Sequence, residues 1–73
     1  MTILNLRGPH ITLAQALKVA GMAGSGGQAK HLIRAGKVRV NGVVETQPGR
    51  KLVAGDSFQA EENPEWQVSA AEI

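Results

Sequence analysis

The residues of this chain best suited to a chemical role are cations gathered in its middle. Residues 28–51 contain six bases and one acid, whereas residues 52–73 contain five acids and no base. The six bases are Lys30, Arg34, Lys37, Arg39, Arg50 and Lys51. Such an asymmetry produces a directed electrostatic field, so we expect an anionic partner to meet the middle of the chain.

The first two bases are spaced to share one face of a helix. Lys30 and Arg34 are four residues apart, which places them about 40° apart around a helix axis. His31 flanks this basic face, either as a ligand contact or as an ordinary surface residue. The apolar positions, Ala29 and Ile33 among them, lie about a third of a turn away. Recognition and core packing therefore use different faces.

The next bases alternate along a predicted strand. Lys37, Arg39 and Asn41 point to one side of a strand, and Val38 and Val40 point to the other. The cationic stripe of the helix is therefore expected to continue onto this strand, with Lys37 joining the helical stripe if the last turn extends that far. Asn41 is already required by the turn that follows, so a ligand contact from it would be an additional role.

A surface of this kind suits phosphate groups. Arginine offers a two-pronged donor, lysine a point charge, and a helix start adds free N–H groups with a partial positive charge. Ser25 opens the second helix, and the glycines around it allow a phosphate to approach closely, although Gly26 and Gly27 can equally be there to shape the turn. Arg50 and Lys51 precede a later strand and are further candidates for the same surface.

Other chemistries find little support. The chain has no cysteine and two histidines, so it offers no thiol nucleophile and no ordinary zinc site. The run Gly24-Ser25-Gly26-Gly27-Gln28-Ala29 matches a dinucleotide-binding fingerprint, but a helix precedes it where that fingerprint needs a strand. No Walker loop occurs, and no acid is placed to orient a histidine beside Ser25. We therefore expect no enzyme activity, cofactor, metal or small-molecule substrate.

Two helices and a hairpin must position these residues. Each helix has an N-cap residue, a glutamine three positions later that completes a capping box, and a glycine just past its end. These residues are Thr12, Gln15 and Gly21 for the first helix, and Ser25, Gln28 and Gly36 for the second. Asn41-Gly42 favours a two-residue turn between strands 38–40 and 43–45.

Shorter strands are predicted around this centre. They span residues 2–6 at a sheet edge, 57–60 and 65–68, and the last five residues are expected to fray. Phe58 and Trp66 are the only aromatic residues and are expected to fill a small core, which argues against base stacking on exposed rings. The fold class is α+β, with two short helices on a small, mostly antiparallel sheet.

Length and hydropathy bear on the number of domains and on membrane contact. The 73 residues suffice for one domain, and no apolar run approaches the roughly 20 residues that span a bilayer. The N-terminus lacks a basic stretch followed by an apolar block. We therefore expect a cytoplasmic monomer without membrane contact.

The segment from Ile11 to Asp56 resembles the RNA-binding domain named after ribosomal protein S four, also called the alpha-L motif. The pattern is Ser25-x-x-x-Ala29-Lys30-x-x-Ile33-x-x-Gly36-x-Val38-x-Val40-Asn41-Gly42, followed by Gly55-Asp56. The chain looks most like the small stand-alone bacterial members of YbcJ type. The resemblance implies one RNA-binding domain over residues 1–73, with an alpha-L core at about 11–56. Many members carry an arginine where this chain has Gly26, so one common phosphate contact is missing.

In this family the two helices and the hairpin present a basic face to structured RNA, often ribosomal. The resemblance implies that role for Ser25, Lys30, His31, Arg34, Lys37 and Arg39. Together with the residue-level arguments, the candidate RNA-binding residues are Ser25, Lys30, His31, Arg34, Lys37, Arg39, Asn41, Arg50 and Lys51. The function expected is non-enzymatic gripping of the phosphate backbone of structured RNA. The alternative is a protein-interaction module that docks an acidic partner on the same face.

Overall fold

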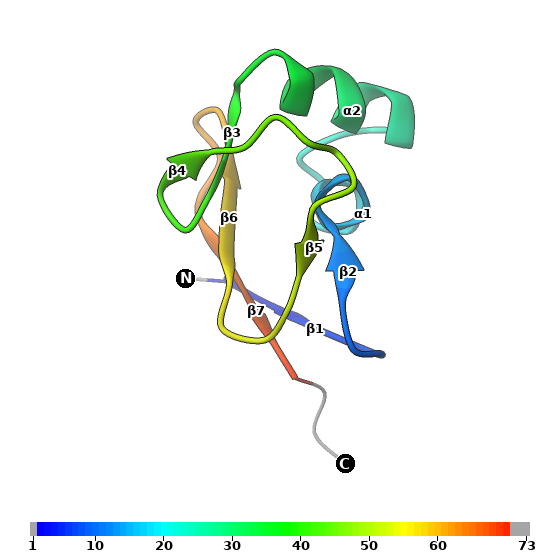
Figure 1. Cartoon of the computed structure of the whole chain (residues 1–73), viewed down its shortest axis with the longest axis vertical. Helices are drawn as coiled ribbons and strands as arrows, with labels where there is room; N and C mark the ends of the chain where they lie inside the picture. Colours follow the sequence, from blue (N-terminus) through cyan, green and yellow to red (C-terminus); the bar gives the residue numbers. More distant parts are fainter. Residues whose placement is uncertain (1, 71–73) are drawn as a thin grey trace.

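Two short helices and two sheets make up the computed structural model, which describes residues 2–70 (Figure 1). The elements are β1 (Thr2–Asn5), β2 (Ile11–Thr12), α1 (Leu13–Val19), α2 (Gly26–Arg34), β3 (Val38–Val40), β4 (Val43–Val44), β5 (Lys51–Leu52), β6 (Ser57–Ala60) and β7 (Trp66–Ser69). The larger sheet has the order β1-β7-β6-β3-β4, and β2 and β5 form a separate pair. All pairs are antiparallel except β1 with β7, which confirms the predicted α+β class.

Both helices begin at the predicted caps. At α1, the Gln15 N–H donates to Thr12 Oγ1 over 3.3 Å and the Thr12 N–H donates to Gln15 Oε1 over 3.2 Å, which is a complete capping box. At α2, the Gln28 N–H donates to Ser25 Oγ over 3.1 Å. However, Gln28 Oε1 accepts from the Gly24 N–H, at 2.6 Å, and not from Ser25. The second predicted capping box is therefore wrong in its return bond, because the glutamine side chain reaches one residue further back.

The turns follow their sequence signals. Gly21 and Gly36 end the helices at φ values of 76° and 77°, a left-handed conformation that glycine adopts without strain. Asn41 and Gly42 have φ values of 53° and 81°, as a type I′ turn requires. The β3–β4 hairpin is therefore confirmed, with Arg39 opposite Val44.

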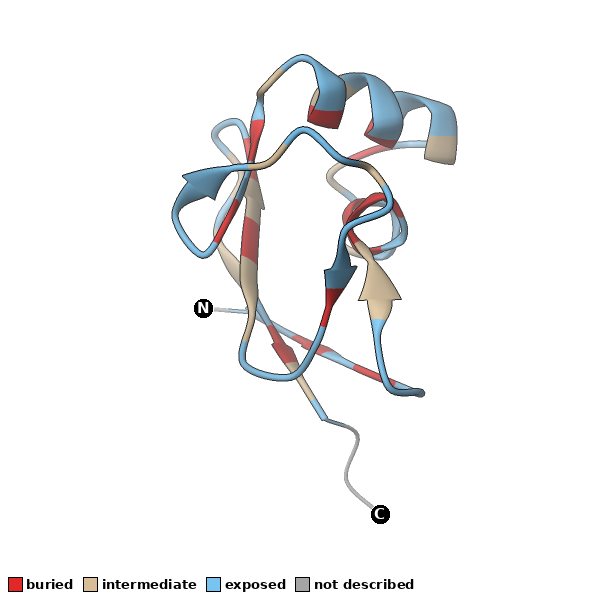
Figure 2. Cartoon of the chain, viewed as in Figure 1, coloured by how far each residue is buried: buried red, intermediate tan, exposed pale blue. Residues whose placement is uncertain are grey.

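One face of the larger sheet packs against the helices to form the core. Val38, Phe58 and Val68 are at most 1% exposed and belong to one apolar cluster with Leu17 and Ile33 of the helices. Buried residues of α2 lie on its inner side, and its outer side is exposed (Figure 2). Trp66 is half-buried against this cluster, with its ring centroid 6.3 Å from that of Phe58. Both aromatic residues thus serve the core, as predicted.

Long-range pairings account for what the sequence did not reveal. β2 was not predicted as a strand, and it forms because Ile11 pairs with Leu52 of β5. β7 extends to Ser69, which pairs with Asn5, so the predicted fraying of the last five residues is wrong at Ser69; residues 71–73 lie outside the described residues. Within residues 2–70, neither helix has the length and apolar character needed to cross a membrane.

Candidate nucleic-acid interface

The exposed side of α2 carries three of the candidate residues. Lys30, His31 and Arg34 are exposed, whereas Ala29 and Ile33 of the same helix are buried. The two ion pairs formed within residues 2–70 do not involve these three side chains. The separation of a basic face from a core face is therefore as the spacing predicts, and the positive charge on α2 is not neutralised by a neighbouring carboxylate in the described part of the chain.

The start of α2 is open on its outer side. Ser25 Oγ accepts the Gln28 N–H, so its hydroxyl hydrogen is left for another acceptor. Within the described residues, the N–H groups of Gly26 and Gly27 donate no hydrogen bond. A side chain at Gly26 would meet no heavy atom within 4 Å of its Cβ. Within residues 2–70, the start of α2 therefore has two N–H groups without a partner, and it has room for a side chain at Gly26.

Lys37 does not extend the helical stripe. α2 ends at Arg34, and the left-handed Gly36 redirects the chain before Lys37 is reached. Lys37 stands at the entry to β3, where its Nζ lies 3.4 Å from Glu61 Oε1. The alternation along β3 is as predicted, with Arg39 exposed between two buried valines.

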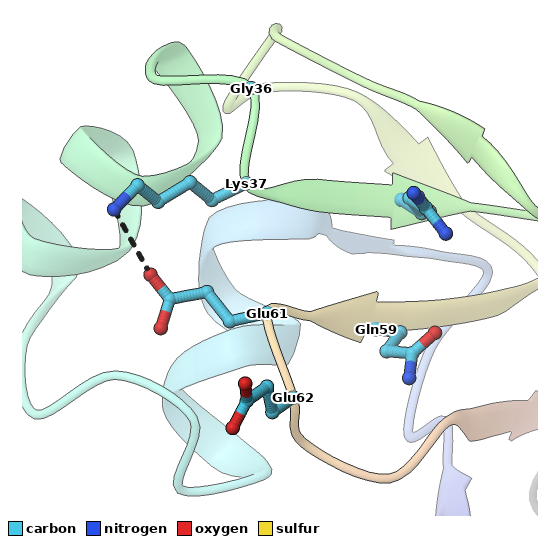
Figure 3. A pocket seen from close by; sticks show the side chains of 6 residues that line it. Gly36, Lys37, Gln59, Glu61 and Glu62 are labelled. Carbon is cyan, nitrogen blue, oxygen red and sulfur yellow. Dashed lines mark ion pairs between the residues drawn. The ribbon is translucent and has the colours of Figure 1, made fainter.

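Lys37 and Arg39 instead line a hollow of about 630 Å³, seen in Figure 3. Gly36, Gln59, Glu61 and Glu62 complete its lining. The β3–β6 pairing creates this neighbourhood, because it sets Arg39 opposite Gln59 and brings the residues after β6 beside the start of β3. The basic middle and the acidic end of the chain, which look separate in the sequence, therefore meet here.

Arg50 and Lys51 occupy a different place. Arg50 Nη1 lies 2.8 Å from Glu45 Oε1, within the loop that joins β4 to β5. This hydrogen bond, with others from the N–H groups of Gln47 and Thr46, holds the pKa of the Glu45 carboxyl below its usual value of 4.5. Lys51 is exposed on β5. Within residues 2–70, neither basic side chain makes a hydrogen bond or ion pair with α2.

Both ends of the Asn41 carboxamide form hydrogen bonds. Its Nδ2 donates to Asp56 Oδ1 over 3.1 Å, and its Oδ1 accepts from the Ser57 N–H over 2.9 Å. Asp56 Oδ2 also accepts from the Val53 N–H over 2.9 Å. The Val53 N–H, together with the Asn41 amide, lowers the pKa of Asp56 below its usual value of 3.8. Asn41 thus ties the β3–β4 turn to the β5–β6 turn, a role that sequence reasoning missed.

The side chains of the described residues show no metal centre beside this surface. Residues 2–70 contain no group of three or more histidine, cysteine, aspartate or glutamate side chains arranged to hold a metal ion. The candidate residues fall into three places. These are the outer side of α2 with Lys30, His31 and Arg34, the hollow with Lys37 and Arg39, and the β4–β5 region with Arg50 and Lys51.

The fold and the pattern of residues define a known class. The S4 domain model matches residues 4–68, and the chain belongs to the S4 domain family. Among curated relatives, it is 47% identical over 49 residues to the putative RNA-binding protein YbcJ of Escherichia coli (strain K12), covering 67% of this chain and 70% of that protein. It is 41% identical over 58 residues to the probable ribosome maturation protein RlbA of Bacillus subtilis (strain 168), covering 80% and 82%.

A solved structure shows the same architecture. The solution structure of E. coli YbcJ, which has an alpha-L motif involved in RNA binding, superposes with a TM-score of 0.71 at 39% identity, and the match covers 96% of this chain and 89% of that one. The resemblance noted from the sequence, to small YbcJ-type members of the family, is therefore confirmed.

Proposed function

We propose that this protein binds structured RNA, ribosomal RNA in particular, by gripping its phosphate backbone without catalysing a reaction. The observation that carries this proposal is the exposed basic face of α2, formed by Lys30, His31 and Arg34, which takes part in no ion pair within residues 2–70. Membership of the S4 domain family supports it, as do the names of two relatives, one a putative RNA-binding protein and the other a probable ribosome maturation protein.

The remaining candidate residues differ in whether the side-chain charge is already paired with a carboxylate. Arg39 and Lys51 are exposed and take part in neither ion pair formed within residues 2–70, so they can contact RNA directly. Lys37 and Arg50 are each paired with a carboxylate, so each must break that ion pair before it contacts a phosphate. This exchange reduces their net contribution to RNA binding. Ser25 contributes its hydroxyl and the neighbouring N–H groups at the start of α2.

Asn41 has a less direct part in this proposal. Because its carboxamide already bonds to Asp56 and Ser57, we assign it to holding the hairpin in place, and a contact of its own with RNA stays a prediction. The chain is proposed to act as a cytoplasmic monomer, in which one copy supplies the whole basic surface.

Salt dependence of binding tests the proposal. The expected slope depends on three cations that form no ion pair within residues 2–70 and lie outside the hollow, Lys30, Arg34 and Lys51. At roughly 0.7 to 0.9 per neutralised phosphate, log affinity should fall with log salt at a slope of about −2 to −3. Fluorescence anisotropy with a structured ribosomal RNA fragment and a DNA duplex of equal charge measures this slope and the preference for RNA. A flat salt response would contradict the proposal and leave the docking of an acidic protein as the better account.

A pair of matched variants tests where the RNA lies. Arg34→Glu reverses a charge on the proposed face, and Lys18→Glu makes the same change on the exposed side of α1. We expect Arg34→Glu to weaken RNA binding roughly tenfold, since it removes one phosphate contact and adds a repulsion. Lys18→Glu should have a much smaller effect. Equal effects of the two variants would show that binding follows net charge and not this face.

A further inference from the structure

The hollow beside β3 differs in chemistry from the rest of the proposed interface. Its lining holds two cations, Lys37 and Arg39, and two carboxylates, Glu61 and Glu62. Lys37 is already paired with Glu61 at 3.4 Å, as the dashed line in Figure 3 marks. The carboxylates would repel a phosphate placed here. The hollow is therefore suited to a ligand that brings hydrogen-bond donors.

A third acceptor lines the same hollow. Gln59 Nε2 donates one of its two N–H groups to the Asn63 carbonyl oxygen over 2.8 Å, which leaves Oε1 and the second N–H for a ligand. Gln59 is set opposite Arg39 by the β3–β6 register. Within residues 2–70, Arg39 and Glu62 form no ion pair. A ligand in the hollow would thus meet one available guanidinium, one amide N–H and several acceptors.

We propose that this hollow binds an unpaired guanine base of the bound RNA, an inference that rests on the proposed function. The Watson–Crick edge of guanine carries two adjacent donors, N1–H and N2–H₂, and an acceptor, O6, beside them. The two oxygens of Glu62 match the donors, and the guanidinium of Arg39 matches O6. The other three bases do not place two donors next to an acceptor on that edge, so the hollow discriminates in favour of guanine.

Size and position fit this assignment. A volume of about 630 Å³ lies within the roughly 300 to 1,000 Å³ typical of small-ligand pockets. The base must be unpaired, because pairing occupies this edge and the grooves of an RNA duplex do not expose it. The hollow begins at Gly36, two residues after α2 ends. RNA held by phosphates on α2 can therefore place a bulged nucleotide in it.

Two hairpin RNAs of equal length and charge test the assignment, one with a single bulged guanosine and the other with a bulged uridine. We expect the wild-type protein to bind the guanosine bulge about tenfold more tightly, which is within the range of a two-pronged base contact. Glu62→Gln should reduce this preference to less than about twofold. The matched control Glu65→Gln removes the same charge outside the hollow, where Glu65 Oε2 accepts from Ser57 Oγ, and should keep the preference.

The outcomes separate this inference from the proposed function. Salt-dependent binding of both RNAs with equal affinity would overturn the guanine site and leave phosphate gripping intact. An equal rise in affinity for both RNAs in Glu62→Gln would overturn it too, because the carboxylate would then only repel phosphate. Absence of RNA binding would overturn both. Arg34→Glu should weaken both complexes equally and keep the preference.

A last experiment tests whether the hollow binds a guanine base within RNA or a free guanine nucleotide. Guanosine monophosphate is titrated alone and followed by the indole fluorescence of Trp66 and by competition with the bulged RNA. Because a single nucleotide lacks the contacts to α2, we expect it to bind far more weakly than the guanosine-bulge RNA. Tighter binding of the free nucleotide would overturn the assignment to RNA.

Discussion

Replacing Asn41 by glycine removes the link between two turns without disturbing the backbone, because glycine adopts a φ of 53° without strain. Three side-chain bonds are lost, of which the one from Ser57 Oγ is long, at 3.4 Å. The two shorter bonds, one to the Asp56 carboxylate at 3.1 Å and one from the Ser57 N–H at 2.9 Å, determine the expected effect. A bond to a charged group contributes about 1.5 to 3 kcal/mol and a neutral one about 0.5 to 1.5. Because both bonds are solvent-accessible, we take the lower end and expect the free energy of unfolding to fall by about 2 kcal/mol.

Urea denaturation followed by Trp66 fluorescence measures this loss. With a slope near 1 kcal/mol per molar urea, typical of the smallest domains, the midpoint should fall by about 2 M. The pH dependence identifies the bond responsible. The pKa of Asp56 is lower in the folded state than its usual 3.8, so its stabilising contribution is full above about pH 4 and is lost as the pH falls through the folded-state pKa.

The difference between wild type and Asn41→Gly should therefore shrink in acid. Asn41→Ala should lose more than Asn41→Gly at neutral pH, since alanine is strained at positive φ. An unchanged midpoint for Asn41→Gly at neutral pH, or a difference that stays constant down to pH 2, would refute the reasoning.

Three further changes test other parts of the structure. Gly26→Arg places a cation in open space at the start of α2 and should steepen the salt slope of RNA binding by about 0.7 to 0.9, whereas the uncharged control Gly26→Gln should leave the slope unchanged. Ser25→Ala removes the acceptor of the Gln28 N–H and should lower the free energy of unfolding by about 1 kcal/mol in urea; a loss below 0.3 kcal/mol would show that the cap is dispensable. Glu45→Gln removes the ion pair with Arg50, so the protein should unfold at a lower urea concentration and the salt slope of RNA binding should steepen. A slope unchanged from wild type would mean that Arg50 does not face the RNA.

Local signals in the sequence predicted the parts of the fold that depend on near neighbours. The helix starts at Thr12 and Ser25 and the turn at Asn41-Gly42 each depend on residues at most four positions apart, and all three are confirmed. The exception is Gln28, whose side chain has two backbone N–H groups within reach and bonds to the one on Gly24.

Features that depend on distant pairing were not predictable in the same way. β2 is two residues long and exists only through β5. The ion pair of Lys37 with Glu61 follows from the β3–β6 register, so the sequence shows a basic segment and an acidic segment but not their contact. The alternating exposure of Arg39, and the i, i+4 pair Lys30 and Arg34, were predictable because strand and helix periods decide them locally.

The parallel pairing of β1 with β7 has a consequence for how the chain matures. Among the described elements β1 is synthesised first, whereas its partner β7, paired from Thr2 with Trp66 through Asn5 with Ser69, is synthesised last. Until β7 is made, β1, which carries the exposed Ile3, is an unpaired strand, while the helices and the hairpin can form from contacts close in sequence. Closure of the larger sheet therefore waits until β7 has been synthesised, by which point the helices and the hairpin can already have formed.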